Sequence, residues 1–413
     1  MIKKDVVIVG GGMVGLSLAL ALHKQNMQVA IVEARSVSHK ALANDRVETR
    51  VSAINHTSKK LLKDLDVWHD IKNNRVSPYH QMRVWDDDPT QIINITAEEI
   101  AEHSLGSIVE NDVITQALLN KIASTGIEIY ENQKIAKIER NGNTEKIILI
   151  DRSPSTSTTL SNHGVEGSSE SASQQKIIET GLIVGADGAN SFIRDYFNFE
   201  TKVKPYKHTA IVATLELEKE HQQIAYQRFY DMGVLAFLPL GNSNKASIVW
   251  SVKSDFADYL MNLGEADFEE KLSNAISGVL GSVKLLSKRF SFELIQRHAQ
   301  SYIQNNVVLV GDACHSIHPL AGQGVNLGFK DVLSLSEVLS KAFAKGRLLG
   351  HISTLDKYQR DRMLDNKKMV MLMRSFKEVF GSENRLVSKL RKKGLEFVDK
   401  NEIVKRVVVK QAL

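Results

Sequence analysis

The sequence predicts an α/β protein, or more broadly an α+β protein, with a Rossmann-like βαβ unit, an antiparallel sheet and C-terminal helices. Three observations support this prediction. Residues 5–33 contain a continuous apolar run typical of a buried strand, then a glycine-rich turn, a helix and a second strand. Four apolar, strand-like runs follow one another between residues 208 and 252. Beyond about residue 325, helical periodicity dominates the chain.

The N-terminal unit has two apolar strands on either side of a helix. Residues 5–9 read Asp-Val-Val-Ile-Val, residues 13–25 have helical spacing, and residues 28–33 form a strand that ends on Glu33. We expect no signal peptide here, because the apolar run is interrupted by glycines and leads directly into another strand. Elsewhere no segment reaches the roughly 18 apolar residues that a membrane-spanning helix needs.

The middle of the chain alternates helix and strand patterns. Helices are expected at 55–66 and 112–125, and strands at 127–130, 135–140, 146–151, 177–185 and 306–310. A meander of consecutive antiparallel strands, which forms the best candidate for a ligand-facing sheet, is expected at 208–217, 224–231, 234–240 and 246–252. Later helices are expected at 325–344, 353–380 and 385–411. Residues 152–176 are rich in Ser, Thr, Asn and Gln, which favours a flexible loop within a hairpin.

Composition limits the class of protein. The chain has 413 residues, of which 43% are hydrophobic and 24% charged, as in globular proteins with two domains. A formal net charge of +5 is too small to indicate nucleic-acid binding. Nine Lys/Arg and four Asp/Glu lie between Glu383 and Leu413, so this segment alone carries +5. The single cysteine, Cys314, excludes an internal disulfide and fits a reducing compartment.

Gly10, Gly12 and Gly15 form a Gly-x-Gly-x-x-Gly pattern between the first strand and its helix. Glycine permits a tight turn and lets a pyrophosphate approach the helix N-terminus, where unpaired N–H groups and the helix dipole favour negative charge. Glu33 can accept hydrogen bonds from ribose hydroxyls. Because a 2′-phosphate would repel this acid, the pattern favours FAD or NAD over NADP.

Two further glycine-and-acid turns favour FAD. Residues 184–194 contain Asp187-Gly188, and residues 310–326 contain Gly311-Asp312. In this order they resemble the motifs of flavoprotein aromatic hydroxylases, whose FAD-binding domain is of the p-hydroxybenzoate hydroxylase type. Asp312 ends a buried strand and can bind ribitol hydroxyls, and the glycines after it can direct N–H groups at the reduced flavin ring. Asp187 is better suited to order its own turn, although the family links this stretch to both FAD and the nicotinamide donor.

Two other expected cofactor contacts leave alternatives open. Arg50 lies where the family places residues near the flavin and pyrophosphate, and the alternative is a surface arginine. Asn111 replaces an Arg or Gln that contacts the cofactor in many relatives, and helix capping by Asn111 or Asp112 is the alternative. The full expected set is Gly10, Gly12, Gly15, Glu33, Arg50, Asn111, Asp187, Asp312, Pro319, Gly322, Gln323, Gly324, Val325 and Asn326.

The resemblance extends from Asp5 to about Leu395 and is strongest to the ubiquinone-biosynthesis hydroxylases. Within that group, the chain is most similar to the bacterial branch that hydroxylates 2-polyprenylphenols at ring position C5. The Ser-rich stretch at 152–176 departs from the family pattern but lies away from its motifs. The stretches that carry the resemblance are Ile8–Leu16, Arg50–Asn55, Val84–Asp86, Gly106–Asn111, Ala236–Leu240, Ser247–Trp250 and His318–Phe329.

The resemblance implies a monooxygenase that uses FAD, NAD(P)H or another electron donor, and O2. Oxygen would add at flavin C4a as a hydroperoxide, and the electron-rich phenol ring would attack its distal oxygen while the protein excludes water. His208 is a candidate base for the phenol, and a partly exposed structural histidine is the alternative. Phe229, Phe237 and Trp250 either line an aromatic pocket or pack in the core.

No metal is expected, because His315 and His318 show no acidic or cysteine partner pattern. A polyprenyl tail is insoluble, so the substrate would be met at a membrane or on an accessory protein. The basic, amphipathic segment after Glu383 could contact either partner, and the alternative is a capping helix with a solvated basic face. The expected location is the cytoplasm or the periphery of the inner membrane.

The expected domain organisation is discontinuous. An FAD-binding domain comprises 1–75, 105–195 and 290–335, a substrate domain comprises 76–104 and 196–289, and a helical segment comprises 336–413. Rival hypotheses are a hydroxylase of the same fold that acts at another ring position or on a soluble aromatic acid, and a non-enzymatic prenyl-binding protein of the Rab-escort type. The last is disfavoured by the intact Gly12, Glu33, Asp312 and Gly324.

Overall fold

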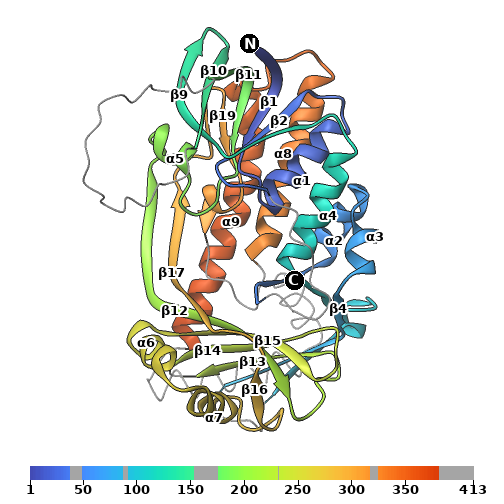
Figure 1. The fold of residues 1–413 in the computed structure, drawn as a ribbon, viewed down its shortest axis with the longest axis vertical. Coiled ribbons are helices and arrows are strands. Elements are labelled where there is room, and N and C mark those ends of the chain that lie inside the picture. The colour runs from blue at the N-terminus through green and yellow to red at the C-terminus, as the bar shows by residue number, and fades with distance from the viewer. Residues whose placement is uncertain (38–48, 87–91, 153–174, 231, 317–323, 381–413) are drawn as a thin grey trace, which may run out of the picture.

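The computed structural model describes residues 1–37, 49–86, 92–152, 175–230, 232–316 and 324–380 (Figure 1). Two large sheets organise these residues, a mostly parallel one at the top of Figure 1 and a mostly antiparallel one at the bottom. The predicted mixture of a Rossmann-like unit, an antiparallel sheet and C-terminal helices is therefore confirmed. The predicted helix at 385–411 lies outside the described residues.

The first sheet contains the predicted βαβ unit. Its strand order is β18 (Ile303–Gln304), β19 (Val307–Leu309), β11 (Lys176–Gly185), β1 (Ile2–Val9), β2 (Val29–Glu33) and β8 (Glu128–Glu131). All neighbours are parallel except β18 and β19, and the sequence Val6–Val9 is buried because helices and strands cover both faces. The hairpin β9 (Gln133–Asn141) and β10 (Thr144–Asp151) joins β11 through β10. The Ser-rich stretch thus connects the antiparallel strands β10 and β11, as predicted, although residues 153–174 lie outside the described part.

Helices α1, α4, α8 and α9 pack beside this sheet, the short helix α3 contacts α4, and the short helix α2 contacts α8 and α3 (Figure 1). Close approach of α1 and α8 depends on glycine, because a Cβ on Gly328 would lie only 2.5 Å from a methyl group of Val14. This contact fixes the start of α8 beside the turn between β1 and α1. The bounds are α1 Met13–His23, α2 His56–Asp64, α3 Trp68–Asn73, α4 Asn111–Ala123, α8 Gly324–Phe343 and α9 Ile352–Phe380.

The second sheet corrects part of the strand prediction. Its order is β20 (His315–Ser316), β17 (Phe290–Ala299), β12 (Thr201–Leu217), β15 (Lys245–Lys253), β14 (Gly233–Pro239), β13 (Ile224–Tyr230), β5 (Gln81–Trp85) and β6 (Ile93–Thr96), and β16 (Val283–Leu285) adds to β12. The four predicted strands are present and antiparallel, but β12 pairs with β15 and not with β13. They form a Greek key, because the chain returns to β12 only after the β13–β15 hairpins.

A smaller sheet and short helices complete the described fold. The sheet has the order β3 (Val51–Ile54), β7 (Gly106–Glu110) and β4 (Val76–Tyr79). The remaining elements are α5 Phe192–Tyr196, α6 Ser254–Asn262, α7 Glu265–Ala275, and the short 3-10 turns Glu98–Ile100 and Gly311–Ala313. Long strands β12 and β17 run along one side of the molecule from the level of the first sheet to the second (Figure 1). Among the described helices, none is long and apolar enough to cross a membrane.

Candidate active site

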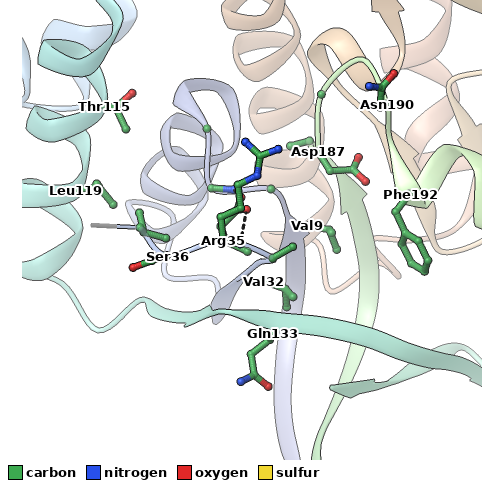
Figure 2. Close-up of a pocket in the computed structure, with 18 of the residues that line it drawn as sticks. Val9, Val32, Arg35, Ser36, Thr115, Leu119, Gln133, Asp187, Asn190 and Phe192 are labelled. Carbon is green, nitrogen blue, oxygen red and sulfur yellow. Dashed lines mark hydrogen bonds between the residues drawn. The ribbon is translucent and has the colours of Figure 1, made fainter. Parts of the chain in front are cut away.

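A groove of about 840 Å³ opens where β1, β2 and β11 end. Its walls are the glycine turn after β1, residues 33–37 after β2 and residues 186–190 after β11, with α4 and β9 closing the sides. Figure 2 shows side chains from these segments around it, among them Arg35, Asp187 and Asn190. Ligands of open parallel sheets bind outside the carboxyl ends of the strands, so this is the expected place for a nucleotide.

The glycine turn has the shape of a phosphate cradle. Gly10 has a φ of +116°, and a Cβ on Gly15 would lie 2.1 Å from the Gly10 carbonyl oxygen, so both positions require glycine. A Cβ on Gly12, by contrast, would meet no atom of the described residues within 4 Å. Gly12 is the N-cap residue of α1 and, as a glycine, makes no side-chain cap hydrogen bond to the N–H groups of that helix. The open space beside uncapped N–H groups fits a pyrophosphate.

Glu33 lies at the same end of the groove. Its Oε2 accepts a hydrogen bond from the Gly11 N–H at 2.6 Å, and its Oε1 accepts one from the Arg35 N–H at 3.0 Å. The acid at the end of β2 is therefore held directly against the phosphate cradle. A ribose attached to a phosphate in the cradle would lie within reach of this carboxylate.

Asp187 orders its own turn, as the sequence analysis anticipated. Its carboxylate accepts hydrogen bonds from the Ser191 hydroxyl and, at 3.1 Å, from the Ile193 N–H. Burial raises the pKa of Asp187, and these hydrogen bonds oppose that effect. Buried Arg194 donates to the carbonyls of Ala189 at 2.9 Å and Ala313 at 3.4 Å. The Asp-Gly and Gly-Asp turns, far apart in sequence, are thus tied to each other.

The second turn presents Asp312 to the surface while its neighbours are buried. Gly311 has a φ of +60°, and its N–H donates to the Asp331 carboxylate at 2.8 Å. Desolvation of the Asp312 carboxylate by the surrounding protein raises its pKa. The nearby charges of His315 and Arg50 act in the opposite direction. Arg50 is exposed and lines the groove, so it and Asp312 share one neighbourhood. The expected contacts to phosphate and ribitol are compatible with these positions.

Other expected cofactor residues have partners within the protein. Buried Asn326 donates to the Ala53 carbonyl at 2.8 Å and accepts from the Asn55 N–H at 3.3 Å, so it ties α8 to β3. The Asn111 side chain accepts from the Ser52 hydroxyl at 2.7 Å, and Glu110, without a side-chain cap, precedes α4. The alternative of capping by Asn111 is therefore not supported. Gly324 and Val325 begin α8, and Pro319, Gly322 and Gln323 lie outside the described residues.

The two faces of the antiparallel sheet differ in what covers them. Phe237 and Trp250 belong to the core on the side of α6 and α7, each 1% exposed. The Trp250 ring lies 5.7 Å from the ring of Phe268 on α7. Phe237 and Trp250 therefore pack in the core, which is one of the two alternatives that the sequence left open. Phe229 points to the opposite face, because side chains alternate along β13.

That opposite face packs in part against the small sheet of β3, β7 and β4. Ser247 on β15 donates to the Thr49 carbonyl at 3.5 Å, and Leu238 on β14 clusters with Ala53 of β3. His208 lies on this face of β12, half-buried, beside a bulge. Its Nδ1 lies 2.9 Å from the Tyr206 carbonyl oxygen, which selects the tautomer with the proton on Nδ1.

A buried polar cluster behind the Gly-Asp turn was missed by sequence analysis. Ligand-type atoms of Cys314, His315 and Asp331 lie within 4.8 Å of one another. The sequence suggested no acidic or cysteine partner for His315, and the fold supplies both. Asp331 already accepts hydrogen bonds from His315 at 2.6 Å and from Arg362 at 2.7 Å. A carboxylate neutralised by a guanidinium is a poor metal ligand, so this cluster is better described as a structural ion pair.

Comparisons with known proteins agree with this geometry. The family described as "FAD binding domain" matches residues 3–373. The chain is 32% identical to the 3-demethoxyubiquinol 3-hydroxylase of Escherichia coli, over 99% of this chain and 98% of that protein. It is 31% identical to the ubiquinone biosynthesis monooxygenase COQ6 of Danio rerio, over 95% and 86% of the two chains. Among solved structures, p-nitrophenol 4-monooxygenase PnpA from Pseudomonas putida has a TM-score of 0.77 at 16% identity, covering 99% of this chain and 97% of its own.

The nucleotide groove, the glycine cradle and the antiparallel sheet define a FAD-dependent monooxygenase of the p-hydroxybenzoate hydroxylase fold. Within that class, the chain belongs to the family of ubiquinone-biosynthesis hydroxylases that includes COQ6. Its cofactor is FAD, and the family also uses a reductant and O2. When bound, FAD supplies the activation of oxygen, and the protein supplies binding, orientation and exclusion of water.

Proposed function

We propose that this enzyme hydroxylates the ring of a polyprenylated phenol at C5 during ubiquinone biosynthesis. The observation that carries the proposal is the apolar character of the sheet face that looks toward the FAD-binding side. Its inward positions on β12, β14 and β15 are Ala210, Val212, Val234, Ala236, Leu238 and Val249. A greasy phenol gains free energy by leaving water for such a surface, at roughly 25 cal/mol per Å² of apolar area.

The charge of this face favours a phenol over an aromatic acid. In the described part of the sheet, the central positions of this face, including Thr214, Ser247 and Ser251, carry no lysine or arginine, and its lysines, Lys245 and Lys253, lie at the two ends of β15. A substrate carboxylate would lose hydration there without gaining a cationic partner. A decarboxylated polyprenylphenol has no such cost. The rival hydroxylase of a soluble aromatic acid is therefore the weaker hypothesis.

An exposed aromatic pair offers a surface for the tail. Phe290 and Phe292 on β17 pair with Val212 and Ala210 of β12, so they lie on the same face. Their side chains are 48% and 43% exposed, which is unusual for two neighbouring phenylalanines on one strand face. We propose that the prenyl tail leaves the ring site across these two side chains.

FAD would be held by the three turns and by the start of α8. We propose that the cradle of Gly10, Gly12 and Gly15 binds the pyrophosphate, that Glu33 binds the ribose and that Asp312 binds the ribitol. His208, with Nδ1 protonated, could receive the phenol proton on Nε2 and so make the ring more electron-rich. Asp187, Asn111 and Asn326 would act through the backbone segments that they fix.

We retain the expected three-part division as part of the proposal. The FAD-binding part is 1–75, 105–195 and 290–335, the substrate part is 76–104 and 196–289, and the helical part is 336–413. In this division β17 (Phe290–Ala299) falls entirely in the FAD-binding part although it belongs to the antiparallel sheet, so this strand connects the two parts. The basic segment after Glu383 lies outside the described residues, and we propose that it contacts an anionic membrane or an accessory protein in the cytoplasm.

Deletion of the gene, followed by mass spectrometry of the accumulated precursor, tests the ring position. A polyprenylphenol that lacks its C5 hydroxyl is the expected result. The Escherichia coli relative is named as a 3-demethoxyubiquinol 3-hydroxylase, so accumulation of a demethoxy precursor would instead assign that later step. Normal quinone levels, in a strain with no compensating hydroxylase, would refute both assignments.

A substrate-length series tests the tail surface with the purified holoenzyme. The double variant Phe290→Ser/Phe292→Ser should raise KM at least fivefold for a long-tailed phenol and less than twofold for a short-tailed one. Leu348→Ser is a matched control, because Leu348 is 53% exposed but lies between α8 and α9. Equal changes for both tail lengths would contradict the proposed path. Activity on a benzoate but not on the decarboxylated phenol would favour the aromatic-acid rival.

A further inference from the structure

A buried ion pair lies directly behind the turn that carries Asp312. Asp331 on α8 has no exposed surface, and its two carboxylate oxygens receive three hydrogen bonds. Oδ2 accepts from the Gly311 N–H at 2.8 Å and from His315 Nε2 at 2.6 Å, while Oδ1 accepts from Arg362 Nε at 2.7 Å. One carboxylate thus joins the Gly-Asp turn, the strand after it and helix α9.

Arg362 is held in place by further polar contacts on α9. Its guanidinium donates to Asp365 at 2.9 Å and to the Asn366 side-chain oxygen at 3.1 Å, and only 3% of the residue is exposed. Asn366 in turn donates to the Tyr302 hydroxyl at 3.1 Å. Tyr358, one turn before Arg362, donates to the Leu309 carbonyl at 2.8 Å, at the end of the strand that leads into the turn. Helix α9 therefore contacts the strand before the Gly-Asp turn directly, and the turn itself through Asp331.

Stability alone does not require this arrangement. A buried ion pair is costly to desolvate, and well-packed apolar residues of similar volume are often as stable or more so. An ion pair instead contributes a fixed side-chain orientation, because the planar guanidinium and the carboxylate orient each other. Here the oriented Asp331 carboxylate accepts a hydrogen bond from the Gly311 N–H, and Gly311 has a left-handed φ of +60°. The next residue is Asp312, so the orientation of the Gly311 peptide sets where the Asp312 carboxylate points.

We infer that Arg362 is a positioning residue for FAD, which acts through Asp331 on the turn that presents Asp312. Asp331 is itself a residue of α8, which begins at Gly324. The same carboxylate therefore links the Gly-Asp turn to α8, the two segments that we propose approach the flavin. Arg362 is not among the described residues that line the groove, so we assign it no direct contact with FAD. Its role goes beyond the proposed reaction, because it concerns FAD binding and holds whichever ring position is hydroxylated.

Three variants of the full-length protein test this inference. Arg362→Met leaves Asp331 without its guanidinium, Arg362→Lys keeps the positive charge but lacks the planar fork, and Arg360→Met is the control. Arg360 lies on the same helix, with its side chain 72% exposed in an ion pair with Asp356. Apoprotein is titrated with FAD, and flavin fluorescence, the visible absorption band of bound flavin and apoprotein melting are recorded.

The expected result separates positioning from folding. Arg362→Met should raise the FAD dissociation constant at least tenfold and shift the visible band of the bound flavin. Arg362→Lys should recover part of the affinity, and Arg360→Met should stay within twofold of the wild type. An Arg362→Met protein that melts earlier but binds FAD with wild-type affinity and spectrum would overturn the inference, because the ion pair would then serve stability alone.

A second variant keeps the test decisive if Arg362→Met does not fold. The double variant Asp331→Asn/Arg362→Met removes both charges, so no unpaired ion remains in the core, and the amide can still accept a hydrogen bond from Gly311. We expect this protein to fold and to bind FAD more weakly than the wild type by at least fivefold. Wild-type FAD affinity in the double variant would refute a positioning role.

Discussion

The Glu33 carboxylate accepts a hydrogen bond from the Gly11 N–H at 2.6 Å, so the end of β2 is joined directly to the turn after β1. This bond brings together a negative charge and the N–H groups that would face a pyrophosphate. Both groups line the same groove, with the turn after β11 opposite them. The cofactor site can therefore be tested one group at a time.

Glu33→Ala should weaken FAD binding about tenfold or more, which corresponds to about 1.4 kcal/mol. The physical reason is the loss of the carboxylate that can accept hydrogen bonds from the ribose. Fluorescence titration of the apoprotein with FAD measures the effect. Glu128→Ala, an acid on the neighbouring strand β8 whose carboxylate pairs with Lys4, is the control; an equal loss in both variants would show that general charge, and not ribose contact, is responsible.

Gly12→Ala and Gly15→Ala should fail in different ways. A Cβ on Gly15 would lie 2.1 Å from the Gly10 carbonyl oxygen, so this variant should melt at a lower temperature even without cofactor. A Cβ on Gly12 would meet no atom within 4 Å in the part of the chain that the structure describes, so the apoprotein should melt normally while FAD affinity falls. Melting curves with and without FAD measure both. Normal FAD binding by Gly12→Ala would place the pyrophosphate elsewhere.

Asp312→Ala should yield largely colourless protein after purification, because the ribitol would lose its carboxylate acceptor. Absorbance near 450 nm, relative to that at 280 nm, gives the FAD occupancy. Asp312 is exposed and makes no hydrogen bond within the described structure that would be lost from the core, so apoprotein stability should hardly change. Full FAD occupancy in the variant would show that the ribitol contact has been misplaced.

Phe237→Ala should destabilise the fold by about 3–5 kcal/mol, because it empties a fully buried position between the sheet and its helices. Urea unfolding of the holoenzyme measures this loss. If enough protein folds, KM for the phenol should remain within twofold of the wild type, since the side chain faces away from the FAD-binding side. A large change in KM with little loss of stability would instead identify Phe237 as a pocket residue.

His298 should make the protein less stable as pH falls from about 6.5 to about 4. Burial lowers the pKa of His298 from 6.5 to about 4, and Nε2 is buried without a partner among the described residues. In this pH window the unfolded chain binds a proton at His298 that the folded protein does not, so stability rises with pH. Above 6.5 both states are neutral and the effect vanishes.

Melting temperatures at pH 7 and pH 5 check this expectation. His298→Gln, which cannot titrate, should lose fewer degrees between the two pH values than the wild type does. The neutral amide can still bond to the Tyr302 hydroxyl, which lies 3.3 Å from His298 Nδ1. Identical pH dependence in the two proteins would mean that His298 is protonated as easily in the folded state as in the unfolded state.

The sequence by itself determined the βαβ unit, the three glycine-and-acid turns and the family. These features are local, because a periodic run of apolar residues selects a strand or a helix, and glycine marks the positions that need a left-handed or crowded backbone. Gly10 and Gly15 were predicted from the spacing, and their geometry explains why no other residue fits. Asp187 was likewise predicted to order its own turn from residues within six positions of it.

Only the tertiary structure decided which strands are neighbours and which face of each strand meets the cofactor side. Alternation along β14 and β15 separates two faces, but it does not say that Phe237 and Trp250 belong with α6 and α7. The contact of Asn326 with the Ala53 carbonyl joins residues that are 273 positions apart. The Asp331–Arg362 pair joins two helices that no local pattern relates, since an ion pair is specified by where packed elements place two side chains and not by the sequence near either one.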